Sequence, residues 1–338
     1  MIKDDLLVMD DFTKGFGSSA ESAGVINEAT NNPLIDGNNQ FSIYEIRMNQ
    51  SEFTYITNYK YYNSANQVAA TANDGSIKPF PQTGKESFLG SLPDWAQQGA
   101  LEVKASWRIL PDDFAFKNRY FTIQADLDNC GQISERPYTF GLVGFHILRL
   151  TPDSPSTWFW ATFEQVDNVE ISKVPQTGLT PSYNPGTSAP YPNYANGFQY
   201  EGGTTAPAEF VCPNTVTYSP VDVSFITDSI QADAPTYDAK YQAMLGENSV
   251  FQYYQLIGVL NPVTSSSYEV QPGYNGAKTY TNSGQSANTT METYSQKGSC
   301  FQCHAFAAPL GASTDSGYPA QPGNQIFSFL LSNAQPPL

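Results

Sequence analysis

Reactive and metal-binding side chains are scarce in this chain of 338 residues. It has four cysteines and two histidines, and only 14% of its residues are charged, against about 25% in an average soluble protein. Basic residues are outnumbered, because 16 Lys and Arg face 32 Asp and Glu and leave a net charge of −16. Since this charge repels a phosphate backbone and an anionic membrane surface alike, the composition argues against nucleic acid and against such membranes as partners.

Long apolar runs are also missing. No window approaches the ~18 consecutive apolar residues of a membrane span, so we expect no transmembrane segment. Residues 1–11 lack the basic region and apolar run of a signal peptide. The start of the chain fits a cytoplasmic protein or an exported one whose signal has been removed. The low Lys content and the abundance of Ser, Thr, Asn, Gln and Tyr favour export.

Short alternating segments predict a β-rich chain. In Leu101–Leu110 the apolar residues fall on one face and Glu102, Lys104, Ser106 and Arg108 on the other, as in a β-strand. The polar, proline-punctuated residues 63–100 predict a long connection, and residues 1–40 and 171–219 predict loops. Further strands are expected at 41–48, 120–125, 139–150, 157–166, 221–226 and 251–260, with helices at 235–245 and 326–334.

These segments predict a mainly β fold with sandwich-like antiparallel sheets, long loops and a few short helices. The turn at 151–155 between two long strands is typical of an antiparallel hairpin. We expect one domain, in which residues 1–100 form a loop-rich N-terminal part and 101–290 a β-rich body. Residues 291–338 form a separate C-terminal segment, defined by the motif that it contains.

That motif collects three of the six cysteines and histidines. Cys300, Cys303 and His304 form Cys-Phe-Gln-Cys-His, which matches the C-x-x-C-H pattern of c-type haem attachment. The spacing suits the chemistry, because two thiols must reach the two vinyl groups on one edge of the porphyrin and the adjacent imidazole must reach the iron. The sequence therefore predicts one covalent haem c, with His304 as the proximal iron ligand.

Two other interpretations of the motif stay open. Cys300 and Cys303 could form a redox disulfide, but such a pair follows an apolar strand and opens a helix, whereas Gly298 and Ser299 precede this one. Zinc is the second alternative. Two Cys and a neighbouring His supply at most three ligands and are poorly spaced for a tetrahedral site.

The motif does not assign the distal position of the iron. Only 338 − 304 = 34 residues follow His304 and none of them is Met, so a distal ligand lies upstream or the position is open. His146, in an apolar run, is the first candidate, although a core histidine bonded to its neighbours is the ordinary alternative. Met291 is a weaker candidate, and Met48 and Met244 complete the set.

The other two cysteines, Cys130 and Cys212, bear on the location of the protein. Covalent haem attachment takes place outside the bacterial cytoplasm, in a compartment where disulfides persist. Because two of the four cysteines are used by the haem, one pair is left, and we expect a disulfide between Cys130 and Cys212; two buried free thiols are the alternative. The expected location is periplasmic or extracellular, with the signal peptide removed.

The chain resembles exported bacterial monohaem proteins known as cytochrome c family proteins, which have no settled activity. The resemblance implies the haem and the export more than any reaction. A His often stands in that family where this chain has Gln165, which implies that a second haem or substrate contact is missing here. The resemblance rests on Leu101–Leu110, residues 143–150 with His146, residues 160–168, residues 251–258, the motif at 300–304 and residues 327–331.

Two weaker patterns have ordinary explanations beside functional ones. Trp160, Phe163, Glu164 and Asp167 could line a haem pocket or bind sugar, or could be a strand with packed aromatics and solvated acids. Residues 49–51 and 288–290 match N-glycosylation acceptors, a pattern that is common by chance. No dinucleotide, phosphate-loop, zincin or nucleophile-elbow motif is present, and a Ser–His–Asp triad would need His146.

Three functions therefore follow from the sequence. The first is electron transfer by a c-type monohaem protein to a redox partner protein or small molecule. The second is a haem enzyme or a gas or peroxide sensor with an open distal position, suggested by the missing downstream Met. The third is a surface- or glycan-binding protein, suggested by the Tyr-rich residues 171–219.

Overall fold

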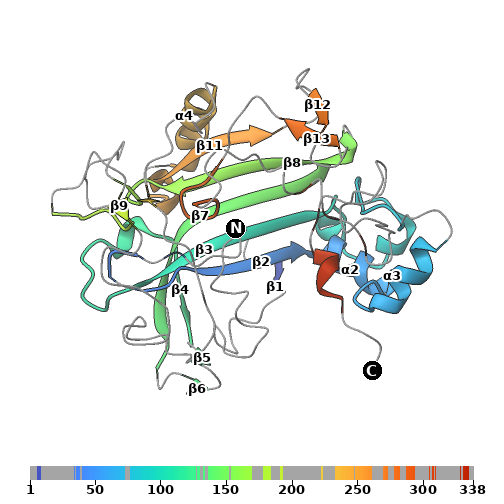
Figure 1. Ribbon diagram of the computed structural model, residues 1–338, viewed down its shortest axis with the longest axis horizontal. Helices are drawn as coiled ribbons and strands as arrows, with labels where there is room; N and C mark the ends of the chain where they lie inside the picture. The colour runs from blue at the N-terminus through green and yellow to red at the C-terminus, as the bar shows by residue number, and fades with distance from the viewer. Residues whose placement is uncertain are drawn as a thin grey trace.

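A seven-stranded antiparallel sheet is the largest element of the structure (Figure 1). Its strands run in the order β1-β2-β3-β7-β8-β11, and β4 pairs with β7 beside this path. The strands are β1 (Leu6–Val8), β2 (Ile43–Asn49), β3 (Leu101–Leu110), β4 (Thr122–Ala125), β7 (Tyr138–Thr151), β8 (Ser154–Gln165) and β11 (Tyr254–Leu260).

The structure is a computed structural model, and it describes part of the chain. The described residues are 6–8, 34, 36–38, 40–72, 77–126, 128–129, 132–133, 136–151, 154–169, 178–183, 191–192, 222–223, 233–246, 248–260, 269–272, 278–281, 287–293, 304, 307, 309, 328 and 330–334. All structural statements concern these residues.

Strand β7 organises the sheet because it pairs with three neighbours. On one side β3 lies antiparallel along nearly its whole length. On the other side β4 pairs with residues 138–141 and β8 with residues 144–151. The expected hairpin between β7 and β8 is confirmed, since Thr151 lies opposite Ser154.

Three α-helices and several single-turn helices lie among the described residues. Asn49 caps α2 by accepting a hydrogen bond from Glu52 N–H at 3.1 Å, and Asn63 caps α3 in the same way. The α-helices are α2 (Gln50–Tyr59), α3 (Ser64–Thr71) and α4 (Ala234–Leu245). The 3₁₀ helices are η2 (Ser87–Leu89), η3 (Asp94–Ala96), η4 (Lys117–Arg119), η6 (Val250–Tyr253) and η8 (Leu330–Asn333). Three separate two-stranded pairs are β5 (Asp128–Asn129) with β6 (Gln132–Ile133), β9 (Tyr191–Pro192) with β10 (Asp222–Val223), and β12 (Glu269–Pro272) with β13 (Lys278–Thr281).

The mainly β architecture with few helices is confirmed. β3 has the predicted bounds, and α4 begins at Ala234, one residue before its predicted start at Pro235. The expectation of a connection over 63–100 was wrong in part, because α3 forms behind its Asn63 cap. Helix α2 was not predicted, and neither was the strand β1, which lies in the predicted N-terminal loop. A second sheet packed face to face, as in a sandwich, stays a prediction.

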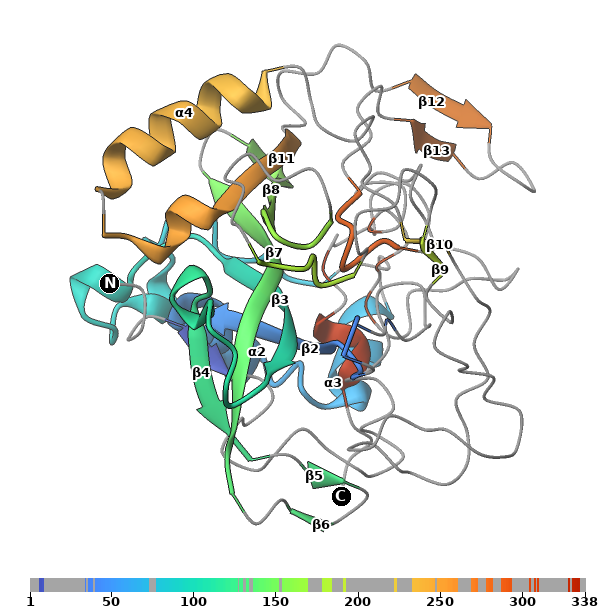
Figure 2. The ribbon, with the colours of Figure 1, turned by 90° about the vertical axis from the view of Figure 1, so that its left-hand side faces the viewer.

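One face of the sheet, which we call the aromatic face, carries an apolar core. Phe145 and Phe163 stack there with ring centroids 4.8 Å apart, and Tyr241 of α4 meets Phe163 edge to face. Helix α4 therefore covers this face along β11 and β8 (Figure 2). The buried members of the cluster are Phe41, Ile43, Ala105, Trp107, Ile109, Ala125, Phe140, Leu142 and Tyr254.

The opposite face, which we call the polar face, is covered by other segments. A second apolar cluster joins α2 and η8 to one end of the sheet, and η8 lies beside α2 and α3 in the figures (Figures 1 and 2). Gln67 of α3 ties the two together by donating from Nε2 to Leu331 O at 2.9 Å. The buried members are Met48, Tyr55, Ile56, Tyr61, Phe80, Ala100, Leu148, Leu150, Trp158, Trp160, Leu330 and Leu331.

Buried ion pairs fix two loops to the other end of the sheet. Arg108 pairs with Asp36 at 2.9 Å, and Arg119 forms two hydrogen bonds to Asp167. The side chains of these residues are at most 4% exposed. Because a buried charge without its partner is costly, these pairs fix where the loops lie. Among the described residues, no helix combines the length and apolar character needed to cross a membrane.

Candidate functional site

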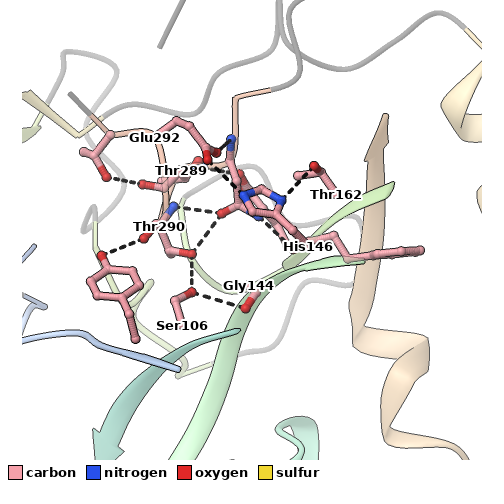
Figure 3. A network of polar contacts seen from close by, with 12 residues as sticks. Ser106, Gly144, His146, Thr162, Thr289, Thr290 and Glu292 are labelled. Atoms are coloured by element: carbon pink, nitrogen blue, oxygen red, sulfur yellow. Dashed lines mark hydrogen bonds and ion pairs between the residues drawn. The ribbon is translucent and has the colours of Figure 1, made fainter. Parts of the chain in front are cut away.

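His146 is the centre of a buried polar network on the polar face (Figure 3). The ring lies on β7, opposite Thr162 of β8, and is 5% exposed. Its Nδ1 is 2.9 Å from Thr162 Oγ1, and its Nε2 is 2.9 Å from Glu292 Oε1. Both ring nitrogens therefore have hydrogen-bond partners.

The network holds the turn formed by residues 287–293 against the sheet. Thr290 is fixed from two strands, because its Oγ1 lies 2.6 Å from Ser106 Oγ and its carbonyl accepts from Tyr44 OH at 2.8 Å. Asn288 donates from Nδ2 to Phe163 O at 2.8 Å. The backbone N–H of Thr289 donates to the carboxyl of Glu164. We call residues 287–293 the clamped turn.

Gly144 lets the clamped turn approach β7. A Cβ at this position would fall against Thr290 Oγ1 and within 2.9 Å of Asn288 Oδ1. Both atoms take part in buried hydrogen bonds. The absence of a side chain at Gly144 is thus a requirement for the contact between the turn and the sheet.

The pKa values of two carboxyl groups of the network are shifted in opposite directions. Burial raises the pKa of Glu164 to about 7, although the N–H of Thr289 acts to lower it. Burial also acts to raise the pKa of Glu292, but the charge and hydrogen bond of His146 and the charge of Lys104 bring it below its ordinary value. The two acids of the network therefore titrate in different ranges of pH.

Thr162, His146 and Glu292 have the residue types of a nucleophilic triad, but a substrate has no access to the hydroxyl of Thr162. A hydroxyl, an imidazole and a carboxylate follow one another at 2.9 Å steps. Thr162 is 1% exposed in the middle of the sheet, where a substrate carbonyl cannot reach its hydroxyl. The arrangement stabilises the fold and orients the imidazole, and it does not form a hydrolase site.

Of the haem motif, the described residues include His304 alone. Its imidazole is partly exposed and meets the ring of Trp160 edge to face, with centroids 5.3 Å apart. The carbonyl of His304 accepts from Ala307 N–H at 3.1 Å. Cys300, Cys303, Cys130 and Cys212 lie outside the described residues, so the thioether attachment and the disulfide stay predictions.

His304 contacts the same face of the sheet to which the side chain of His146 points. Trp160 pairs with Leu148, and Thr162 pairs with His146, one step further along the same two strands. Residues two apart in a strand point to the same face. The polar face therefore carries the contact of His304 and the buried network side by side.

The structure places the proposed distal ligands in four different surroundings. To reach iron, His146 would have to give up its hydrogen bond to Thr162 or to Glu292. Met291 is fully buried in the clamped turn, and Met48 lies in the apolar cluster that contains Trp160. Met244 is 82% exposed on α4. None of these surroundings assigns the ligand, and the distal position stays open as a question for spectroscopy.

The predicted aromatic-acidic cluster does not form one site. Trp160 and Glu164 point to the polar face, whereas Phe163 stacks in the core of the aromatic face. Asp167 is bound to Arg119. Gln165, at the position where the resembled family often has His, donates to Asp167 and to Arg119 O, so it supports the ion pair.

Both glycosylation acceptors have structural roles instead. Asn49 is 6% exposed and caps α2, and Asn288 is fully buried in the clamped turn. Neither amide can carry a glycan while these contacts exist. The clamped turn itself was missed by sequence reasoning, because polar residues at 287–293 have the composition of an ordinary loop.

Comparisons with known proteins returned no match: no family model, no curated protein and no solved structure is similar to this chain. Among the described residues, no group of three His, Cys, Asp or Glu side chains is placed to hold a metal ion. The site therefore rests on the motif and on the contacts given above.

Proposed function

We propose that this protein is a c-type monohaem protein that transfers electrons to a redox partner outside the cytoplasm. Cys300 and Cys303 would form the thioether links, and His304 would be the proximal ligand. The observation that carries the proposal is the spacing of these three residues, which is the pattern of covalent haem attachment. The C-terminal segment would then be the haem-attachment part of a sandwich-like β protein.

The residues of the motif fit the group. Two thiols and one imidazole are the donor set of haem c, which when bound supplies a one-electron iron couple. Trp160, 1% exposed, supports the imidazole of His304 from the sheet. The clamped turn ends at Thr293, seven residues before Cys300 in the sequence. The negative charge of the whole chain would steer a basic partner towards it.

A haem enzyme or sensor with an open distal position is the second candidate. The contacts of His146 favour it, because both ring nitrogens already have partners at 2.9 Å. A ligand that has to break a buried hydrogen bond gives up about 0.5–1.5 kcal/mol and leaves a buried polar group unpaired. This cost makes His146 less suited to iron than a histidine held by one bond.

Covalent attachment is tested on the full chain, exported from cells that carry out c-type haem maturation. Denatured protein is extracted with acidified acetone, and the pigment is followed on a denaturing gel. We expect the pigment to stay with the chain, to be lost or reduced to a single link in Cys303→Ser, and to be retained in Cys212→Ser as the matched control. Pigment that washes out of the unaltered chain, or the absence of pigment, would refute the proposal.

The two candidate functions are separated by the spectrum of the reduced protein. A low-spin spectrum that does not change with carbon monoxide supports electron transfer, and a high-spin spectrum that changes supports an open distal position. If His146→Ala converts a low-spin spectrum to a high-spin one, His146 is the distal ligand despite its hydrogen bonds. An unchanged spectrum in that variant removes it from the candidates.

A further inference from the structure

Two buried carboxyl groups face each other where α2 meets the sheet. Glu52 belongs to the first turn of α2 and is 0% exposed, and Glu102 on β3 is 5% exposed. Glu52 stands three residues after the cap Asn49, where a glutamate ordinarily turns back to the N-terminal backbone of its helix at the surface. Here it points into the interior instead. This pair is separate from the haem motif and from the network of His146.

The pair has almost no other polar partners. Both carboxyl oxygens of Glu52, and Oε1 of Glu102, are buried without a hydrogen bond of ordinary geometry, although the backbone of Leu101 acts to lower the pKa of Glu52. Glu102 interacts with the hydroxyl of Ser328 and with Glu52. Its neighbours across the sheet are the apolar side chains of Met48 and Leu148. A buried carboxylate in such surroundings is costly unless it is paired, and here the available partner is a second acid.

The surrounding charges do not offset the cost of ionising the two buried acids. Among the described residues, the charge that acts on Glu52 comes from Glu102, and no basic side chain is among the groups that shift either pKa. Burial raises the pKa of Glu52 well above its ordinary value, and the neighbouring Glu102 raises it further. Burial raises the pKa of Glu102 as well. The surrounding titratable groups are Tyr55 on α2, Tyr61 after α2, and Lys104, which follows Glu102 on the same face of β3 and lies over the ring of Tyr44.

We propose that Glu52 and Glu102 share a proton and that this shared proton fastens α2, Ser328 and η8 to the sheet. One carboxyl then donates to the other, which satisfies buried oxygens that otherwise lack a hydrogen bond of ordinary geometry. When the proton leaves, two like charges lie in a dry site, and the contact between helix, strand and C-terminal segment weakens. The pair is a pH-sensitive switch built into the polar face.

A series of packed residues connects the pair to the candidate haem site. Ser328, beside Glu102, precedes Leu330 and Leu331, which pack in the same apolar cluster as Trp160. Trp160 in turn contacts His304. Loss of the shared proton thus disturbs the side of the sheet on which His304 rests, but the switch itself does not depend on haem.

The sign of the pH dependence follows from the raised pKa values. The unfolded chain ionises these acids near their ordinary pKa, whereas the folded chain keeps the proton to higher pH. The folded state binds more protons in that window, so the free energy of unfolding falls as pH rises through it. The contribution is fully present in acid and is lost as pH increases past neutrality.

The test measures urea unfolding of the full chain by far-ultraviolet circular dichroism at about pH 5 and about pH 8.5, where the linkage is largest. The variants are Glu52→Gln, Glu102→Gln and the double variant, because Gln keeps the shape and can donate to the remaining acid. Asp94→Asn, at an exposed position of η3, is the control for loss of one negative charge. We expect the unfolding constant to rise with pH at least about tenfold more in the unaltered chain than in Glu52→Gln, since one unit of pKa corresponds to tenfold.

Parallel pH profiles of the unaltered chain and Glu52→Gln overturn the proposal. Calcium or magnesium that stabilises the dialysed unaltered chain at alkaline pH, but not Glu52→Gln, also overturns it, because the pair would then hold a cation. If the Gln variants do not fold, infrared spectra of the unaltered chain decide. A carbonyl band of a protonated carboxyl that persists at neutral pH and disappears in alkali supports the shared proton, and its absence contradicts it.

Discussion

The two faces of the sheet are both buried, but different interactions bury them. The aromatic face packs rings on rings, as Phe145 does on Phe163 with an interplanar angle of 12°. On the polar face an apolar cluster covers the end next to α2 and η8, and directed contacts hold the rest, in which Ser106, His146 and Glu164 bind the clamped turn. Ring packing depends on shape and is insensitive to pH, whereas hydrogen bonds to acids and imidazoles depend on protonation. The faces should therefore respond differently to mutation and to pH.

The comparison also assigns a role to each face. Three features of the described residues that bear on the proposals lie on or against the polar face: the contact of His304 with Trp160, the clamped turn and the Glu52–Glu102 pair. The aromatic face, with α4 against it, provides a rigid support. A sheet that is rigid on one side and titratable on the other can hold a cofactor segment in place and still respond to pH.

The largest effect is expected on the aromatic face. Phe140 is 0% exposed and lies between Ile109 of β3 and Ile123 of β4, so Phe140→Ala leaves a cavity in the core. The free energy of unfolding should fall by about 3–5 kcal/mol. Urea unfolding should give the same loss at acid and alkaline pH. A loss that varies strongly with pH would contradict the division between the two faces.

A smaller effect is expected where β7 meets the clamped turn. Gly144→Ala places a methyl group against Thr290 and Asn288, and overpacking of this kind costs about 1–3 kcal/mol. Amide hydrogen exchange should increase in the clamped turn and stay unchanged along β4. Gly141→Ala, whose Cβ would meet the side chain of Leu110 rather than the clamped turn, is the matched control, and equal exchange in both variants would argue against a specific clamp.

The sequence was sufficient to predict elements whose pattern is local. Leu101–Leu110 alternates so regularly that its strand has the predicted bounds, and the proline and glycine at the ends of α4 mark its limits. The same alternation misjudges burial, because it is typical of a half-buried strand. Glu102, Ser106 and Arg108 are each at most 5% exposed, since segments distant in the sequence cover them.

The candidate site also has a local part and a long-range part. The motif of Cys300, Cys303 and His304 is contiguous and can be recognised in the sequence, whereas the partners of His146 could not be predicted from it. Glu292 is 146 residues from His146, and Thr290 is 184 residues from Ser106. No local pattern specifies pairings of this length, because they depend on where the chain returns to the sheet.

The pH response of the network gives a third test of the difference between the two faces. The pKa of Glu164 is raised to about 7 by burial, so its contribution to stability is present in acid and is lost as pH rises through 7. The pKa of Glu292 is lowered by His146 against the effect of burial, so its contribution is present at neutral pH and is lost in acid.

The free energy of unfolding should therefore decline less between about pH 5 and about pH 8.5 in Glu164→Gln than in the unaltered chain, by about 1–2 kcal/mol. Glu292→Gln should lower the free energy of unfolding at neutral pH but change it little in acid. Each variant is the control for the other, because both remove one acid from the same network. Thermal unfolding followed across this pH range measures both. Two variants with the same slope would show that the acids do not titrate as their surroundings require.

The smallest effect is expected at Thr162, and it separates a structural hydroxyl from a reactive one. Thr162→Val keeps the shape of the side chain and removes one hydrogen bond to His146 Nδ1, which costs about 0.5–1.5 kcal/mol. Thr162→Ser restores the hydroxyl and should recover most of the loss in urea unfolding. If the chain carries the proposed haem, the Val variant should also leave its spectrum unchanged, because the clamped turn still holds His146 through Glu292. If Thr162→Val instead shifts the spectrum as His146→Ala does, the imidazole acts on the iron, and the polar face is part of the haem site rather than its support.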